Sequence, residues 1–219
     1  MIKREIITLL QKDIRLEIRQ AYGINSILLY VVSTIFVCFL SFGGIIEKSS
    51  WNSLFWIILL FAAVNGASKS FIQENPARHI YYYTICHPQS VILAKILYNI
   101  VLMLVVAFLS YLVFTLFMGD KVQNHFSFII LLILAAVGFA SVLTMVAAIA
   151  SRSSNNFALM AILSFPVIMP LLLSLIKASS ILLAEISLQS ATPYMLAIAA
   201  LDLIVIILAY MLFPYLWRD

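Results

Sequence analysis

Long apolar stretches recur along this chain, and each is long enough to cross a lipid bilayer as a helix. About 20 apolar residues in a helix span a hydrocarbon layer roughly 30 Å thick. The sequence predicts six such spans, with approximate bounds 25–46, 53–70, 91–118, 126–150, 157–176 and 194–217. The alternating segments of a membrane β-barrel are absent from it. We therefore expect an all-α integral membrane protein, with residues 1–219 forming a single transmembrane domain.

The basic residues are unequally divided between the two ends of these spans. Six spans place both chain ends on one side, and ten of the 13 Lys and Arg residues fall on that side. They are Lys3, Arg4, Lys12, Arg15, Arg19, Lys69, Arg78, Lys95, Arg152 and Arg218. Short loops rich in Lys and Arg are typical of the cytoplasmic side of a membrane protein. We therefore expect both termini to be cytoplasmic.

Large aromatic residues flank the predicted spans. They are Trp51, Trp56, Tyr81, Tyr82, Tyr83, Tyr194, Tyr215 and Trp217. Tryptophan and tyrosine concentrate at membrane–water interfaces, because one part of each ring system is apolar and another is polar. We interpret these residues as interfacial anchors.

Two connections between the predicted spans are longer than the others. Residues 71–90 form a cytoplasmic connection and residues 177–193 an external loop. Neither leaves room for a folded soluble domain, and the chain contains no P-loop, HExxH or GxSxG motif. Cys38 and Cys86 form no CxxC pair, and most buried cysteines are inert packing residues. We expect a non-catalytic chain with no metal site, no firmly bound cofactor and no nucleic-acid partner.

The residues ahead of the first span, 1–24, have the pattern of an amphipathic helix at the cytoplasmic membrane surface. Projected at about 100° per residue, the apolar side chains form one arc and the basic side chains another. The basic stripe suits anionic lipid head groups. Asp13 and Glu17 lie beside the apolar arc, where two like charges four residues apart repel each other. They are either solvated charges or a docking surface for basic groups of this bundle or of a partner.

Several residues in or beside the spans are open to two interpretations. Asp202 is an intramembrane acid, either a neutral or hydrogen-bonded packing residue or a proton or substrate site. Pro166 and Pro170 remove helix hydrogen bonds from one span and predict a kink, which serves either conformational change or the shape of the bundle. His125, at the outer edge of the fourth span, is either an ordinary polar residue or a haem or metal ligand.

Five segments, spread over nearly the whole chain, form a recognisable series. They are KDIRLEIR, KSFIQE, HPQSVILAKILYN, GFASVLTMVAAIASRSSNN and LSFPVIMPLLL. In this order they resemble the CcmB family, the permease subunits of the cytochrome c maturation ABC transporter. The resemblance implies an ABC-2-type permease, with six membrane helices, an amino-terminal interface helix and a coupling segment between the second and third spans.

The same resemblance implies partners and a role. The chain would form a homodimer in a bacterial inner membrane, with a separate CcmA-type subunit that binds and hydrolyses ATP. CcmC- and CcmD-type haem-handling subunits and the haem chaperone CcmE would join it, so haem would be present in the assembled complex. The implied role is to couple ATP hydrolysis to release of the haem-loaded chaperone, historically described as haem export. The coupling and docking residues would be Lys12, Asp13, Arg15, Glu17, Arg19, Glu74, Arg78 and Lys95.

Three other functions are compatible with the residues. Another ABC-2-type permease would export a lipid, a drug or a polysaccharide through the same number of spans. A proton-coupled carrier would use Asp202 as its proton site. A purely structural membrane subunit would show no dependence on ATP.

Overall fold

The computed structural model describes residues 2–20, 22–44, 46–72, 86–151, 156–184 and 188–218. In these residues the chain forms seven helices and no strand. They are α1 (Ile2–Gln20), α2 (Tyr22–Phe42), α3 (Lys48–Ile72), α5 (Pro88–Met118), α6 (His125–Ala150), α7 (Asn156–Leu183) and α8 (Leu188–Arg218). All except α1 are long and apolar enough to cross a membrane. The predicted all-helical class and its six spans are therefore confirmed.

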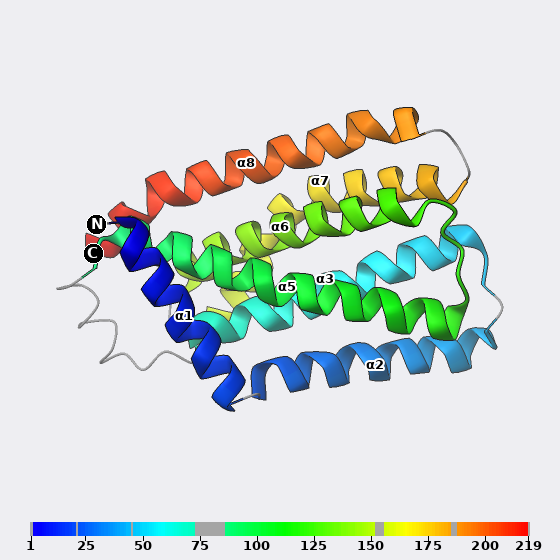
Figure 1. Ribbon diagram of the computed structural model, residues 1–219, viewed down its shortest axis with the longest axis horizontal. Helices are drawn as coiled ribbons and strands as arrows, with labels where there is room; N and C mark the ends of the chain where they lie inside the picture. The colour runs from blue at the N-terminus through cyan, green and yellow to red at the C-terminus, as the bar shows by residue number, and fades with distance from the viewer. Residues whose placement is uncertain are drawn as a thin grey trace.

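The six long helices run side by side, and α1 crosses the bundle at the end where both chain termini lie (Figure 1). We call this the terminal end, and the other the opposite end. Helix α6 is the most buried of the six spans and packs against α3, α5, α7 and α8. Small residues on α6, among them Ala135, Gly138 and Ser141, allow this because they let neighbouring backbones approach closely.

Aromatic side chains from α3, α5 and α6 form the core at the opposite end. The ring of Trp51 lies 5.0 Å from Phe114 and 5.6 Å from Phe55, measured between centroids. The Trp51 indole N–H donates to the Gly119 carbonyl at 3.1 Å. Trp51 and Trp56 are both fully buried, so the prediction that they are interfacial anchors is wrong. Their rings instead pack edge-to-face against Phe114 and Phe55 inside the bundle, an arrangement that stabilises aromatic pairs.

The other predicted anchors are placed differently. Tyr215 is exposed and Tyr194 half-buried, as expected for rings near the surface of a bundle. Residues 81–83 and the side chain of Trp217 lie outside the described residues.

Helix α2 ends at Phe42, earlier than predicted. Gly43 and Gly44 follow it with positive φ angles of 61° and 77°, a conformation that glycine adopts without the strain that a side chain causes. The glycine pair therefore ends the helix before the apolar stretch itself ends at Ile46.

The predicted external loop at 177–193 is wrong, because most of it is helical. Helix α7 continues to Leu183 and α8 begins at Leu188. The Lys48 ammonium group donates to the Leu183 carbonyl at 2.8 Å, at the negative end of the α7 dipole. Ala178 is fully buried on the added turns, so this part of α7 packs on protein although several of its residues are polar.

A buried polar contact fastens the end of α7 to α3. The Asn52 amide N–H donates to the Ile176 carbonyl at 2.9 Å, and the Asn52 side-chain oxygen accepts from the Ser179 hydroxyl. The Trp56 indole N–H lies between them, 3.0 Å from the Asn52 oxygen and 2.8 Å from the Ser179 oxygen. Each polar group therefore has a partner where water cannot supply one.

Pro166 and Pro170 both lie inside α7. Both rings are exposed on the surface of the chain, so they line no path through the interior of this bundle. They face lipid or another subunit, and the expected kink stays a prediction.

Replacing Asn52 with alanine tests the contact between α3 and α7. The change leaves the Trp56 and Ser179 side chains buried with one partner fewer, so we expect the free energy of unfolding to fall by about 1–3 kcal/mol. Unfolding in detergent micelles measures this loss. Ser53→Ala is a matched control, because the Ser53 hydroxyl bonds only to Ser49 in its own helix. Equal stabilities of the two variants would contradict the importance of the contact.

Candidate functional site

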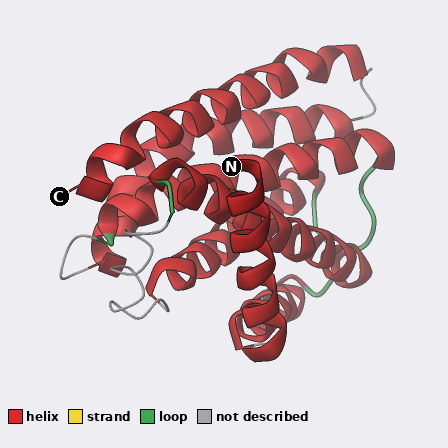
Figure 2. Cartoon of the chain, turned by 60° about the vertical axis from the view of Figure 1, so that its left-hand side comes forward, coloured by secondary structure: helices red, strands yellow, loops and turns green. Residues whose placement is uncertain are grey.

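Helix α1 packs against the first half of α5 at the terminal end, crossing in front of the bundle in Figure 2. Leu10 and Ile14 pack on the bundle core. Ile7 and Ile18, on the same apolar arc, remain 54% and 73% exposed. Part of the apolar arc therefore packs α1 onto the bundle, and the rest is free to contact the lipid boundary.

Three carboxylates on α1 contact groups at the start of α5, and we call these the α1–α5 contacts. The pairs are Glu5–His87, Asp13–Lys95 and Glu17–Tyr98. The distances from the carboxylate oxygen to the partner atom are 3.2, 3.5 and 2.9 Å in that order. A carboxylate is unfavourable on a helix face that meets lipid, but each of these three lies against a basic or hydroxyl group of the same chain.

The α1–α5 contacts follow the periodicity of both helices. Glu5 and Asp13 are as far apart in the sequence as His87 and Lys95. At 1.5 Å per helical residue, both separations correspond to about 12 Å. The partners therefore follow one another in the same order along both segments, although α1 crosses α5 at an angle (Figure 1).

The Asp13–Lys95 ion pair is buried, with side chains 8% and 6% exposed. Lys12 contacts the other oxygen of Asp13 at 2.9 Å. These two ammonium groups offset the repulsion that Asp13 meets from Glu17, one helical turn away. Removing one partner of a buried pair takes away much of what compensates the other charge, which is destabilising.

Glu17 joins three helices. One of its oxygens accepts from the Tyr98 hydroxyl of α5 at 2.9 Å. The other accepts from the backbone N–H of Ile24, in the first turn of α2, at 2.8 Å. A carboxylate is favoured there because the first N–H groups of a helix lack partners within the helix. Glu17 therefore fixes the corner between α1 and α2 onto α5.

Glu5 lies where the connection 71–90 meets α5. Both the Nδ1 atom and the backbone N–H of His87, which precedes Pro88 of α5, lie near its carboxylate, the latter at 3.4 Å. The Ser90 hydroxyl beside it, and then the His87 contacts, hold the pKa of Glu5 below its ordinary value. The ionised form of Glu5 is therefore favoured by the folded chain.

The remaining predicted coupling residues are not gathered at this site. Arg15 and Arg19 are exposed on α1, where they remain available to lipid head groups or to another subunit. Glu74 and Arg78 lie outside the described residues. Asp202 is buried in α8, on a different helix from any of the α1–α5 contacts.

Sequence reasoning missed Glu5, His87 and Tyr98. Their signal is the repeated eight-residue spacing, which pairs Glu5 and Asp13 with His87 and Lys95 only once α1 is known to lie beside α5. Tyr98 carried no signal, because a tyrosine near a span end is ordinarily explained as an interfacial anchor.

His125 lies at the opposite end, and both of its ring nitrogens have neighbours. Nδ1 is 2.9 Å from the Tyr111 hydroxyl, and Nε2 is 3.4 Å from an oxygen of Asp120. An incoming haem iron would have to displace one of these groups. Within the described part of the chain, no three His, Cys, Asp or Glu side chains are grouped to hold a metal ion.

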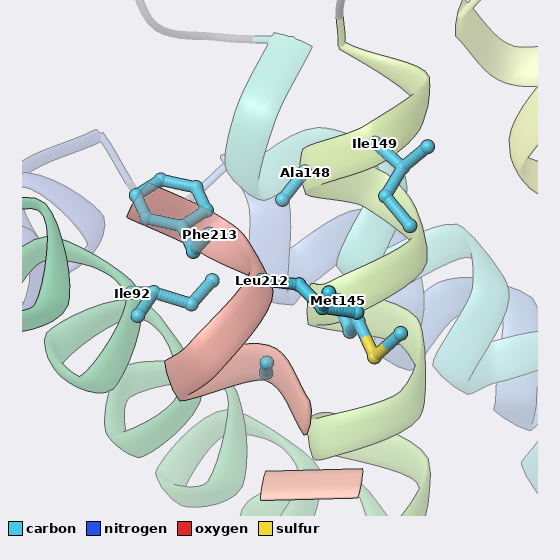
Figure 3. A pocket seen from close by; sticks show the side chains of 7 residues that line it. Ile92, Met145, Ala148, Ile149, Leu212 and Phe213 are labelled. Atoms are coloured by element: carbon cyan, nitrogen blue, oxygen red, sulfur yellow. The ribbon is translucent and has the colours of Figure 1, made fainter. Parts of the chain in front are cut away.

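Two cavities lie toward the terminal end. One, of about 10 Å³, is lined by apolar side chains such as Ile92, Met145 and Phe213 (Figure 3). It is no larger than a water molecule needs and offers no polar group to a ligand. The other, of about 330 Å³, is an open hollow between the start of α5 and the end of α8, lined by residues that include Gln89 and Tyr215.

Comparison with known proteins gives one match. The family model described as "CcmB protein" matches residues 4–215. No curated protein and no solved structure matches the chain. The matched region includes every residue of the α1–α5 contacts.

A double-mutant cycle tests the buried ion pair. Asp13→Leu alone leaves Lys95 charged and buried, and we expect it to lower the free energy of unfolding by about 3–5 kcal/mol. The double variant Asp13→Leu/Lys95→Met should recover most of this loss, because two apolar side chains of similar volume replace the pair. Chemical unfolding in micelles measures both values. Gln11→Ala, an exposed position on α1, is the control, and strictly additive effects would contradict direct pairing.

The Glu5 contact predicts acid sensitivity of α1. A carboxylate with a lowered pKa contributes stability above its ordinary pKa of 4.5, and this stability is lost as the pH falls through the lowered value. The protection factors of the amide hydrogens in the first turns of α1 should therefore fall in that acid range. Glu5→Gln should show low protection factors already at neutral pH and little further change on acidification. Identical exchange profiles for the two chains would refute a role of Glu5 in holding α1.

Proposed function

The chain belongs to the CcmB family and is thus a membrane subunit of a cytochrome c maturation ABC transporter, and we propose that it transmits the work of a separate ATPase through α1 and α5. ATP is bound and hydrolysed by the CcmA-type partner, and this chain is non-catalytic. The output is release of the haem-loaded chaperone CcmE from the CcmC- and CcmD-type subunits.

The observation that carries this proposal is the position of Glu5. The predicted connection 71–90, the expected docking segment for the ATPase, ends at His87 directly before α5, and Glu5 of α1 contacts His87. A displacement of the connection reaches α5 and α1 together. Because Glu17 bonds both α5 and the start of α2, these three helices are fastened to move as one unit.

The proposal includes the orientation and assembly of the subunit. The terminal end faces the cytoplasm of a bacterial inner membrane, because ten of the 13 basic residues lie on that side of the predicted spans. Two copies of the chain form a homodimer above two ATPase subunits. Arg15 and Arg19, exposed on α1, are suited to anionic lipid head groups at that face.

Motion is passed to the far side of the membrane through helices rather than through a loop. The end of α7 is tied to α3 by Asn52, and Lys48 caps its last carbonyl. The end of α7 is therefore fastened to α3, which in turn packs against α2 and α5.

The surroundings of His125 favour a transmitting role over a haem channel. Both ring nitrogens have close neighbours, Tyr111 and Asp120, and the larger of the two cavities lies at the other end of the bundle. Haem is then held by the haem-handling partners of the complex. Membership in the CcmB family also favours this pathway over export of a lipid, a drug or a polysaccharide.

Uncoupling variants test the proposed route. The variants are Glu5→Ala, Glu74→Ala and Arg78→Ala. Each should leave the membrane helices folded and the ATPase active, yet lower the yield of holo-cytochrome c. A coupling energy of roughly 1–3 kcal/mol corresponds to a loss of about 5- to 150-fold. ATPase turnover in proteoliposomes and cytochrome c assembly in cells measure the two activities.

The control is Glu47→Ala, which removes an exposed carboxylate at the opposite end. It should leave both activities unchanged. Normal cytochrome c assembly in all three uncoupling variants would show that the connection and α1 do not transmit movement from the ATPase to the membrane helices.

A further inference from the structure

Asp202 is the one acidic residue buried deep inside a span among the described residues. It lies in α8, its side chain is 4% exposed, and neither carboxyl oxygen has a hydrogen-bond partner in the described part of the chain. Buried carboxylates normally have donors for both oxygens, because an ionised oxygen without donors costs several kcal/mol in an apolar environment. The form of this carboxyl that fits its surroundings is the one without charge.

Side chains and backbone from neighbouring helices pack closely around the Asp202 carboxyl. A Cβ atom added to Gly138 of α6 would lie 2.5 Å from an Asp202 oxygen and 2.9 Å from both terminal carbons of Leu171 in α7. Three helices thus meet at this carboxyl, and only a glycine leaves room for it. We call the meeting point of Asp202, Gly138 and Leu171 the seam. Its tight packing leaves no space for a hydrated cation beside the carboxyl.

No described basic group lies at the seam. On α6 the titratable side chain is His125, on α7 Lys177, and both lie toward the opposite end, away from the middle of the span. On α8 the other titratable residues are three tyrosines and Arg218, which is the last residue of the helix, at the terminal end. Lys95 of α5 is paired with Asp13. Among the described residues, none therefore neutralises the charge of Asp202, which leaves a proton for that role.

We propose that Asp202 is a proton-binding site that reports whether the seam is closed. With the seam closed, the carboxyl keeps its O–H bond. When α8 moves away from α6 and water reaches the group, the O–H bond breaks, the proton passes to water and a hydrated carboxylate remains. Closing the seam takes the proton back, so the cycle consumes none and needs no other reactant.

Proton uptake on closure makes the seam sensitive to pH. A group that is protonated in the closed state and ionised in the open state adds stability at low pH, and this stability is lost as the pH rises. For a single proton, the ratio of closed to open seam changes up to tenfold per pH unit within the sensitive range. The variant Asp202→Asn is the neutral mimic, since an amide has the shape of the protonated acid but cannot ionise.

Infrared spectroscopy of the full chain in lipid bilayers tests the protonation state directly. At neutral pH the wild-type chain should show the carbonyl stretch of a protonated carboxylic acid, and Asp202→Asn should lack that band. The matched control, Glu47→Gln, removes an exposed carboxylate and should keep it. An unchanged spectrum in Asp202→Asn at neutral pH would mean that the group is ionised, and this result would overturn the proposal.

A stability titration provides a second readout that a packing role alone would not change. The wild-type chain should lose stability relative to Asp202→Asn as the pH rises, with a slope approaching one proton. A difference in the free energy of unfolding that stays constant over the whole pH range would assign Asp202 a packing role only. That result would contradict the proposed proton site. Both results leave the role of α1 untouched, because the α1–α5 contacts lie on other helices.

Discussion

Inside a bilayer no water is available to backbone or side chain, so a polar group there is costly unless it finds a partner within the protein or carries no charge. The backbone meets this demand with six helices. The side chains meet it by gathering at defined places, where Asn52 joins Trp56 and Ser179 at the opposite end, and Asp13 joins Lys95 at the terminal end. These polar contacts join particular helices to one another within the apolar core that all six spans share.

The same demand explains why α1 is part of the bundle. Its apolar arc alone would allow it to float at the lipid boundary, as the exposed Ile7 and Ile18 show. Its carboxylates remove that freedom, because Asp13 is buried against Lys95 and Glu17 bonds two other helices. A helix held in this way can transmit a displacement from one of its ends to the other. A loosely bound lipid anchor cannot do so.

The features that could be predicted from the sequence are those that depend on local pattern. Hydropathy alone identified the spans, and helical periodicity identified α1 and the unusual place of Asp13 and Glu17. The burial of Trp51 and Trp56 was missed because a ring near a span end has the same local pattern whether it faces lipid or protein. The long α7 was missed because Lys177, Ser179 and Ser180 look like loop residues until Asn52 of α3 supplies a partner. Glu5 was missed for the same reason, since its partner His87 is distant in the sequence.

The central claim is that α1 and α5 move as one unit during ATP hydrolysis, and distances between spin labels test it most directly. One pair, at Gln11 and Leu97, joins exposed positions of α1 and α5, and a second pair, at Gln11 and Leu203, joins α1 to α8. In the assembled transporter the first distance should stay constant between nucleotide-free and ATP-bound states, while the second changes. Separation of the first pair on ATP binding, in a transporter that still matures cytochrome c, would contradict the account.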